Sequence, residues 1–251
     1  AQCSGCSDPR FRSWYAEAAS GPKDVILVLD TSGSMQDYER ITKMREAASW
    51  VVNTLSMNDH AAVVSYSSVA KAYPDDGLLM KMDVVGRAKV KNHISDLAAS
   101  GATNMEAGIT RAFQIMAASG RAGRTSKCSK VMLFLTDGQR SNGRNPVDVA
   151  HEMNAGGDTQ MRIFTYSFGG GADVKEMKAL ACQNQGVWQA VPDGGDLKQI
   201  MAGYFLYLSA GLDANSNGGI GDTDVATHKN IRWSDWFEDG QGLGQLTGAC
   251  S

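Results

Sequence analysis

The sequence has no excess of basic residues. The 251-residue chain carries 24 Lys and Arg against 27 Asp and Glu, which gives a formal net charge of −3. Proteins that bind nucleic acid without sequence preference depend on a broad positive field, so the composition argues against that class. The chain also lacks any run of about 18 apolar residues, the length that crosses a bilayer. We therefore expect no nucleic-acid partner and no membrane span in this chain.

Motifs of common enzyme classes are also missing. The sequence contains no GxSxG nucleophile elbow, no GxxxxGK[ST] phosphate loop and no GxGxxG fingerprint. The four histidines, His60, His93, His151 and His228, are scattered and form no acid–base or metal-binding pattern. We therefore expect a protein that is not an enzyme.

Cysteines are few and odd in number. Cys3, Cys6 and Cys250 lie near the two ends, and Cys128 and Cys182 lie in the body of the chain. No second CxxC and no clustered histidine accompany the first pair, so disulfides of a secreted protein are favoured over a zinc site. Cys128 and Cys182 either pair with each other, remain free thiols, or leave Cys128 to bond a partner chain.

Short apolar runs alternate with segments of helical periodicity. Residues 24–30 form a continuous apolar run between two aspartates, typical of a parallel strand buried on both faces. In residues 36–55 the apolar positions recur at steps of three and four, as on one face of a helix. The expected strands are 24–30, 61–66, 69–73, 131–136, 161–168 and 187–191, and the expected helices are 36–55, 85–99, 105–118, 146–155, 173–183 and 195–209.

This alternation predicts an α/β fold. We expect a doubly wound, mostly parallel six-stranded sheet with helices on both faces and a small appendage at each end of the chain. In such folds ligands bind at the carboxyl ends of the strands, beside a topological switch point.

Three segments predict oxygen-bearing side chains at that edge. Asp30 ends the first strand and is followed by Ser32 and Ser34, with a glycine between the serines. Thr103 lies in a loop before a helix, and Asp137 follows the strand at 131–136. Carboxylates and hydroxyls together make a hard, all-oxygen site that suits Mg²⁺, Mn²⁺ or Ca²⁺. The alternative is that these residues are helix caps and turn formers.

With these five positions the chain resembles a von Willebrand factor type A domain over residues 24–209. The metal-ion-dependent adhesion site of that family has the pattern DxSxS, then Thr, then Asp, and every residue type matches here. The resemblance implies that the three hydroxyls contact the metal and that the two aspartates act directly or through water. It implies an extracellular adhesion module whose metal binds an Asp or Glu of a protein partner. A metal that only stiffens a structural or matrix protein is the alternative.

Loops around this site are expected to form the rim that a partner touches. The residues concerned are 36–38, 104–105 and 139–142, which follow or flank the segments that carry the five oxygen-bearing side chains.

The flanks of the chain show a second resemblance. Residues 10–15, 18–24, 180–186 and 231–236 are similar to segments of calcium-channel α2δ subunits, in which the adhesion domain is inserted in a Cache domain. Arg12, Trp14 and Tyr15 match the part of a Cache pocket that can bind an amino acid, which implies a small-ligand or channel-auxiliary module as an alternative function. The competing interpretation is that these aromatics pack against the tryptophans of the C-terminal flank. We expect a Cache-like flank at 1–23, the adhesion domain at 24–209 and a second flank at 210–251.

The C-terminal flank also has the spacing of a calcium loop. Oxygen-bearing side chains recur at alternate positions and are followed by a glycine and a closing carboxylate, as in EF-hand or dockerin loops. The residues are Asp213, Asn215, Asn217, Asp222 and Asp224. The segment is either such a Ca²⁺ loop or a polar linker.

Overall fold

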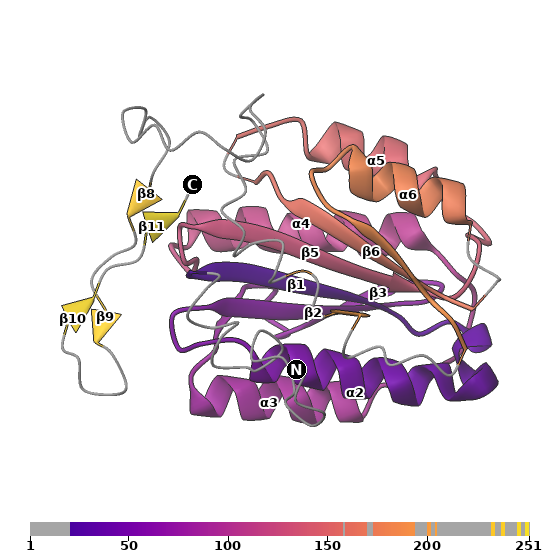
Figure 1. Cartoon of the computed structure of the whole chain (residues 1–251), viewed down its shortest axis with the longest axis horizontal. Helices are drawn as coiled ribbons and strands as arrows, with labels where there is room; N and C mark the ends of the chain where they lie inside the picture. The colour runs from indigo at the N-terminus through magenta and orange to yellow at the C-terminus, as the bar shows by residue number, and fades with distance from the viewer. Residues whose placement is uncertain are drawn as a thin grey trace, which may run out of the picture.

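The computed structural model describes residues 21–157, 159–169, 173–193, 200, 201 and 204, with the backbone of four short strands near the C-terminus (Figure 1). The elements are β1 (Lys23–Asp30), the 3₁₀ segment η2 (Gly33–Glu39), α2 (Arg40–Asn53), β2 (His60–Tyr66), β3 (Ala70–Tyr73), β4 (Met80–Lys81), α3 (Val84–Ser95), α4 (Met105–Arg121), β5 (Ser129–Thr136), α5 (Pro146–Met153), β6 (Arg162–Phe168), α6 (Val174–Cys182) and β7 (Trp188–Val191). The short strands are β8 (Arg232–Trp233), β9 (Phe237–Glu238), β10 (Gln245–Leu246) and β11 (Ala249–Cys250).

The main sheet has the order β3-β2-β1-β5-β6-β7. Neighbours from β2 to β7 run parallel, whereas β3 and β4 pair antiparallel with β2. The predicted doubly wound α/β class is confirmed. The sheet has seven strands instead of the predicted six, because β4 also pairs with β2. β4 has only two residues, too few to show the alternation that predicts a strand.

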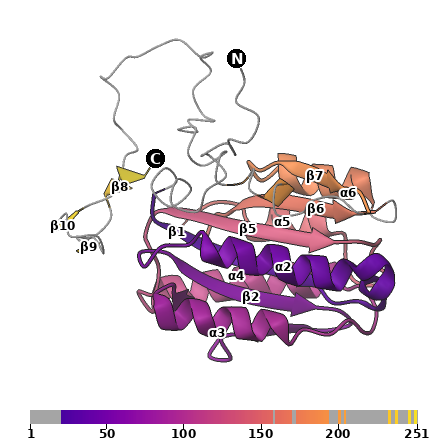
Figure 2. The same cartoon turned by 60° about the horizontal axis from the view of Figure 1, so that its bottom comes forward.

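Alternate residues of the central strands enter two separate hydrophobic cores. Val25, Leu27 and Leu29 of β1 pack with the apolar faces of α2 and α3. Ile26 and Val28 pack with α4, α5 and α6 on the opposite face. Figures 1 and 2 show the sheet between these two helical layers. Burial on both faces explains why the central strands are continuous apolar runs.

The first helix begins later than its periodicity predicts. Residues 36–39 belong to η2, which is interrupted by non-helical backbone, and Tyr38 and Glu39 have left-handed φ angles of 51° and 58°. The side-chain amide of Gln36 donates to the carbonyl of Ala99 at 2.9 Å. This contact joins the segment to a neighbouring loop, and α2 starts only at Arg40.

Two other expectations on the helices have different outcomes. The helix expected at 85–99 ends at Ser95. Of the helix expected at 195–209, residues 200, 201 and 204 are helical, and the rest lies outside the described residues. In the described part of the chain, no helix is both long enough and apolar enough to cross a membrane.

The cysteines of the main domain differ from the expected pair. Cys128 is disulfide-bonded, whereas Cys182 is a free, exposed thiol. The prediction of a Cys128–Cys182 disulfide is therefore wrong. The remaining expectations on the flanks fall outside the described residues; they concern Cys3, Cys6, Arg12, Trp14, Tyr15, Asp213, Asn215, Asn217, Asp222 and Asp224.

Candidate metal centre

The site lies where the winding of the sheet reverses. β1 is flanked by β2 on one side and by β5 on the other, so the crossovers leave this point in opposite directions. Asp30 is the last residue of β1, and Asp137 directly follows β5. The parallel register pairs Leu29 with Leu135, which brings both aspartates to the same edge. This is the switch point at which doubly wound folds bind their ligands.

Asp30 is fixed by hydrogen bonds from three elements. Its Oδ1 accepts from the backbone N–H of Ser32 at 2.8 Å. Its Oδ2 accepts from the hydroxyl of Thr136 at 2.8 Å and from that of Tyr66 at 3.4 Å. Burial raises the pKa of Asp30 to about 6; the bonds from Ser32 and Thr136 oppose this shift, and the charge of Asp137 adds to it. The carboxylate is thus held in one orientation in surroundings that disfavour an uncompensated negative charge.

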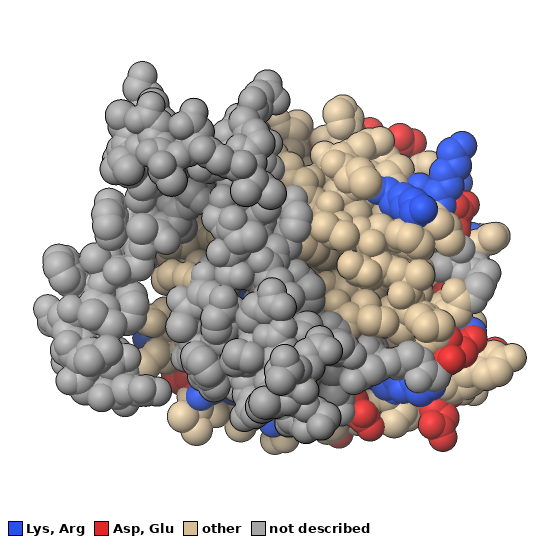
Figure 3. Space-filling view, in the orientation of Figure 1, with Lys and Arg blue, Asp and Glu red and all other residues tan. Residues whose placement is uncertain are grey.

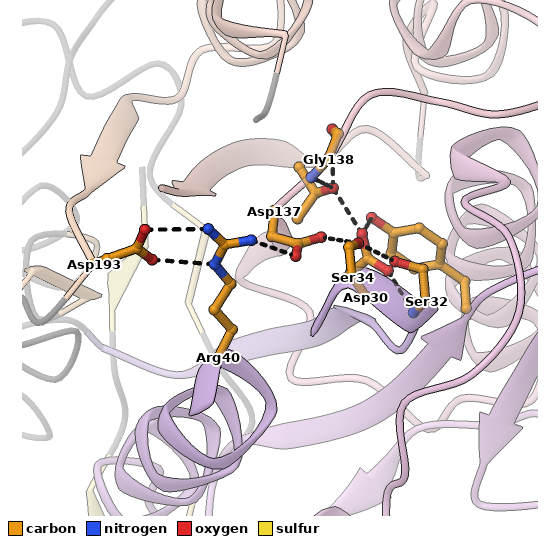
Figure 4. A network of polar contacts seen from close by, with 9 residues as sticks. Asp30, Ser32, Ser34, Arg40, Asp137, Gly138 and Asp193 are labelled. Atoms are coloured by element: carbon orange, nitrogen blue, oxygen red, sulfur yellow. Dashed lines mark hydrogen bonds and ion pairs between the residues drawn. The ribbon is translucent and has the colours of Figure 1, made fainter. Parts of the chain in front are cut away.

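A row of oxygen atoms runs from Ser32 through Ser34 to Asp137 (Figure 4). The hydroxyls of Ser32 and Ser34 lie 3.2 Å apart, and Ser34 donates to Oδ1 of Asp137 at 2.8 Å. Ser32 and Asp137 are buried, at 1% exposure each, whereas Ser34 is exposed. The row therefore opens to solvent at Ser34.

Backbone pairing between loops positions Thr103. The N–H of Gly33 donates to the carbonyl of Gly101 at 3.0 Å, and that of Ser100 donates to the carbonyl of Thr31 at 2.7 Å. A Cβ atom built on Gly138 would lie 3.8 Å from the Ser34 hydroxyl and 3.9 Å from the Thr103 hydroxyl. Both hydroxyls therefore face Gly138, whose lack of a side chain leaves room between them.

The donor set fits a hard divalent cation. Each of the five predicted residues contributes oxygen, and at least three of them meet through hydrogen bonds. Among the described residues, no group of three or more His, Cys, Asp or Glu side chains is placed to hold a metal ion. A site built here depends on neutral hydroxyls beside two carboxylates, the oxygen chemistry that Mg²⁺, Mn²⁺ and Ca²⁺ prefer.

The structure adds two charged residues that the sequence did not reveal. Arg40, the first residue of α2, donates from Nη1 to Oδ2 of Asp137 at 3.0 Å. Its Nε and Nη2 donate to the two carboxylate oxygens of Asp193, each at 3.1 Å. Arg40 and Asp193 are 153 residues apart, and neither belongs to a motif, so no local pattern indicates their contact.

The residues of the expected rim differ in exposure. Residues 139–142 are exposed, and Tyr38 is 67% exposed. Met105 was expected at the rim but is fully buried in the core beneath α4, so this expectation is wrong. Asn104 caps α4 by accepting from the N–H of Ala107 at 3.1 Å, as its position before the helix predicts. Figure 3 shows described charges of both signs at the right-hand end of the molecule in this view.

The family model for the von Willebrand factor type A domain matches residues 24–203. Similar full-length proteins include two voltage-dependent calcium channel subunits of Mus musculus. The alpha-2/delta-3 subunit is 26% identical over 243 residues, which are 96% of this chain and 22% of that subunit. The alpha-2/delta-2 subunit is 28% identical over 243 residues, which are 94% of this chain and 19% of that subunit. The chain spans about a fifth of the length of these curated relatives.

Solved structures show the same fold. A von Willebrand factor type A protein from Catenulispora acidiphila aligns with a TM-score of 0.63 at 23% identity, over 76% of this chain and 43% of that one. Proximal thread matrix protein 1 from the mussel byssus, in a structure with a zinc-occupied MIDAS motif, aligns with a TM-score of 0.60 at 18% identity. That alignment covers 77% of this chain and 47% of the mussel chain.

Proposed function

The chain belongs to the von Willebrand factor type A domain family, and we propose that it is a binding module that uses a divalent cation to bind an acidic side chain of a protein partner. Asp30, Ser32, Ser34, Thr103 and Asp137 would hold the cation. The observation that carries the proposal is the row of hydroxyl and carboxylate oxygens that runs from Ser32 through exposed Ser34 to Asp137.

The charges of the site favour an anionic ligand. Two carboxylates balance one divalent cation, and the hydroxyls add donors without adding negative charge. A bound cation would supply the electrophilic centre that accepts one more oxygen. Asp30 orients the loop after β1 through Ser32, and Asp137 orients the Ser34 hydroxyl. An Asp or Glu of a partner would enter from the solvent side, at Ser34.

We assign the chain to binding proteins and not to enzymes. A serine nucleophile needs an adjacent base that takes its proton. The hydroxyls of Ser32 and Ser34 contact each other and the carboxylate of Asp137. In the part of the chain that the structure describes, no histidine forms a hydrogen bond with the hydroxyl of either serine.

The proposed location is outside the cell or on its surface. Disulfides persist in oxidising compartments, and Cys128 is disulfide-bonded. The similarity to calcium-channel alpha-2/delta subunits supports the same location. The proposal includes a disulfide between this chain and another chain. It also includes, as the alternative function, an auxiliary role in a larger channel-like assembly.

Calorimetric titration of metal-stripped protein tests the site. Mg²⁺, Mn²⁺, Ca²⁺ and Zn²⁺ would be added separately to the wild type, to Asp30→Ala and to Asp76→Ala. Asp76 is a matched control because its carboxylate lies in an exposed ion pair with Arg124. We expect saturable binding by the wild type and by Asp76→Ala, and its loss in Asp30→Ala.

Acetate then serves as a simple carboxylate probe. Water-proton relaxation of the Mn²⁺-loaded protein should fall as acetate displaces coordinated water. Absence of saturable metal binding, or equal binding by Asp30→Ala, would overturn the cation site. Metal binding without any acetate effect would support the structural role, in which the cation only stiffens the domain.

A further inference from the structure

Arg40 connects the proposed cation site to the end of the sheet. Its guanidinium donates to Asp137 on one side and, through two parallel hydrogen bonds, to Asp193 on the other (Figure 4). Asp193 follows β7, and Asp137 follows β5. The arginine therefore bridges the carboxyl ends of two strands that are not neighbours in the sheet.

The surroundings hold the guanidinium in place. The Arg40 side chain is only 11% exposed, and the exposed ring of Tyr38 lies 5.0 Å from its Cζ atom. Gly169, at the end of β6, has a φ angle of 60°. A Cβ on that glycine would lie 3.1 Å from Cζ of Arg40 and 3.0 Å from Oδ2 of Asp193. The ion pair thus packs directly on backbone that has no side chain, which leaves it little freedom to move.

This arrangement has a consequence for charge. Both oxygens of Asp137 are engaged, Oδ1 by the Ser34 hydroxyl and Oδ2 by Arg40. The positive guanidinium offsets much of the negative charge of Asp137, so Asp30 is the carboxylate of the site without a cationic partner. A cation bound beside Ser34 would therefore face less than two full negative charges. Asp193, by contrast, adds negative charge behind Arg40, and its side chain is 35% exposed.

We infer that Arg40 sets the charge of the cation site. By pairing with Asp137 it weakens the hold of the site on the cation, and for the same reason it strengthens the attraction of the bound cation for an anionic ligand. Asp193 is the positioning residue that keeps Arg40 against Asp137. This inference rests on the proposed function, since it concerns the same site and the same acidic partner.

Opposite shifts in two affinities test the inference. Mn²⁺ affinity would be measured by calorimetry, and acetate affinity of the Mn²⁺-loaded protein by water-proton relaxation. Loss of one unit charge at a partly solvated site changes such affinities roughly three- to tenfold. In Arg40→Gln we expect Mn²⁺ to bind tighter by roughly that factor and acetate to bind correspondingly weaker.

Three further variants separate charge from structure. Asp193→Asn removes negative charge and should weaken Mn²⁺ binding, by about two- to threefold because its carboxylate is partly exposed. Arg40→Lys keeps the charge but loses the two-pronged contact, so its Mn²⁺ affinity should lie between the wild type and Arg40→Gln. Arg124→Gln is the matched control, since it breaks an arginine–aspartate pair away from the site.

The outcomes are distinct. Tighter Mn²⁺ binding in Arg40→Gln with weaker binding in Asp193→Asn supports the inference. Weaker Mn²⁺ binding in both variants would mean that Arg40 only maintains structure, and the inference would be wrong while the cation site stood. If the wild type bound no Mn²⁺, the proposed function and the inference would fall together. Thermal unfolding would check that each variant is folded. If Arg40→Gln is not, Arg40→Lys carries the test, because Mn²⁺ binding tighter than in the wild type supports the inference and weaker binding overturns it.

Discussion

Replacing Asp24 by Asn should remove much of the pH dependence of this protein's stability. Asp24 is fully buried near the start of β1, at the edge of the sheet opposite the cation site. Its Oδ1 accepts from the N–H of Ser126 at 2.7 Å, but its Oδ2 has no hydrogen-bond partner. His60 lies beside it, with Nδ1 at 3.8 Å from Oδ1, and that nitrogen is also buried without a partner.

The magnitude follows from the titration of Asp24. Burial raises the pKa of Asp24 from 3.8 to about 7, opposed by the bond from Ser126 and the charge of Lys130, with a smaller raising effect of Asp59. A raised native pKa means that the folded protein binds the proton more tightly than the unfolded chain does. The contribution of Asp24 to stability is therefore fully present below its unfolded pKa of 3.8 and is lost as pH rises through its folded pKa of about 7. Between pH 5 and pH 8 this one group should lower the free energy of unfolding by about 2–3 kcal/mol.

Urea denaturation at pH 5 and pH 8, with EDTA present, measures this effect. Asn keeps an acceptor for Ser126 and carries no charge that burial would disfavour, so Asp24→Asn should be more stable than the wild type at pH 8. The pH 5-to-8 loss of stability should shrink by about 2–3 kcal/mol. Asp30 titrates in both proteins, so its contribution cancels. Asp75→Asn, at an exposed position, is the control. Equal pH dependence in the wild type and Asp24→Asn would refute the reasoning.

Two further predictions concern stability. Lys23→Met should lower the free energy of unfolding by about 3–5 kcal/mol, because it leaves the buried Asp59 carboxylate without the ammonium that lies 3.1 Å away; a loss below about 1 kcal/mol in urea denaturation would contradict this. Gly169→Ala should lower the free energy of unfolding by about 1–3 kcal/mol, because Gly169 has a left-handed φ of 60°. Gly120→Ala should raise it by roughly 0.5–1 kcal/mol, because Gly120 lies in α4 with open space around its Cα. The argument would be refuted if thermal unfolding showed the same change in Tm for both variants.

The cation site illustrates how much a short motif can predict. Asp30 and Asp137 each stand at the end of a continuous apolar run, and such runs are readable because both faces of a parallel strand are buried. Because the strands are parallel, their carboxyl ends lie at the same edge of the sheet. The Ser32–Ser34–Asp137 row follows from that placement. The position of Thr103 relative to the two aspartates does not follow from the strands, since it depends on backbone pairing between two loops.

The errors have physical causes as well. The periodicity of residues 36–55 continues through η2, but contacts with the Ala99 loop and left-handed backbone at Tyr38 delay the helix to Arg40. Met105 was expected at the rim from its position beside Thr103. It turns inward because the first turn of α4 lies on the sheet. The spacing of neighbouring residues indicates neither the contact of η2 with the Ala99 loop nor the packing of Met105 on the sheet.

Apolar periodicity and turn chemistry are local properties of the chain, so the α/β class, the alternation of elements and the oxygen-bearing residues of the proposed site can be predicted from residue order. Which distant charges meet depends on the three-dimensional fold. Arg40 reaches Asp137 and Asp193, and Asp24 lies beside His60, because the order of strands in the sheet brings these residues together. Electrostatic coupling depends on distance in space and on burial, and the order of residues along a chain specifies neither.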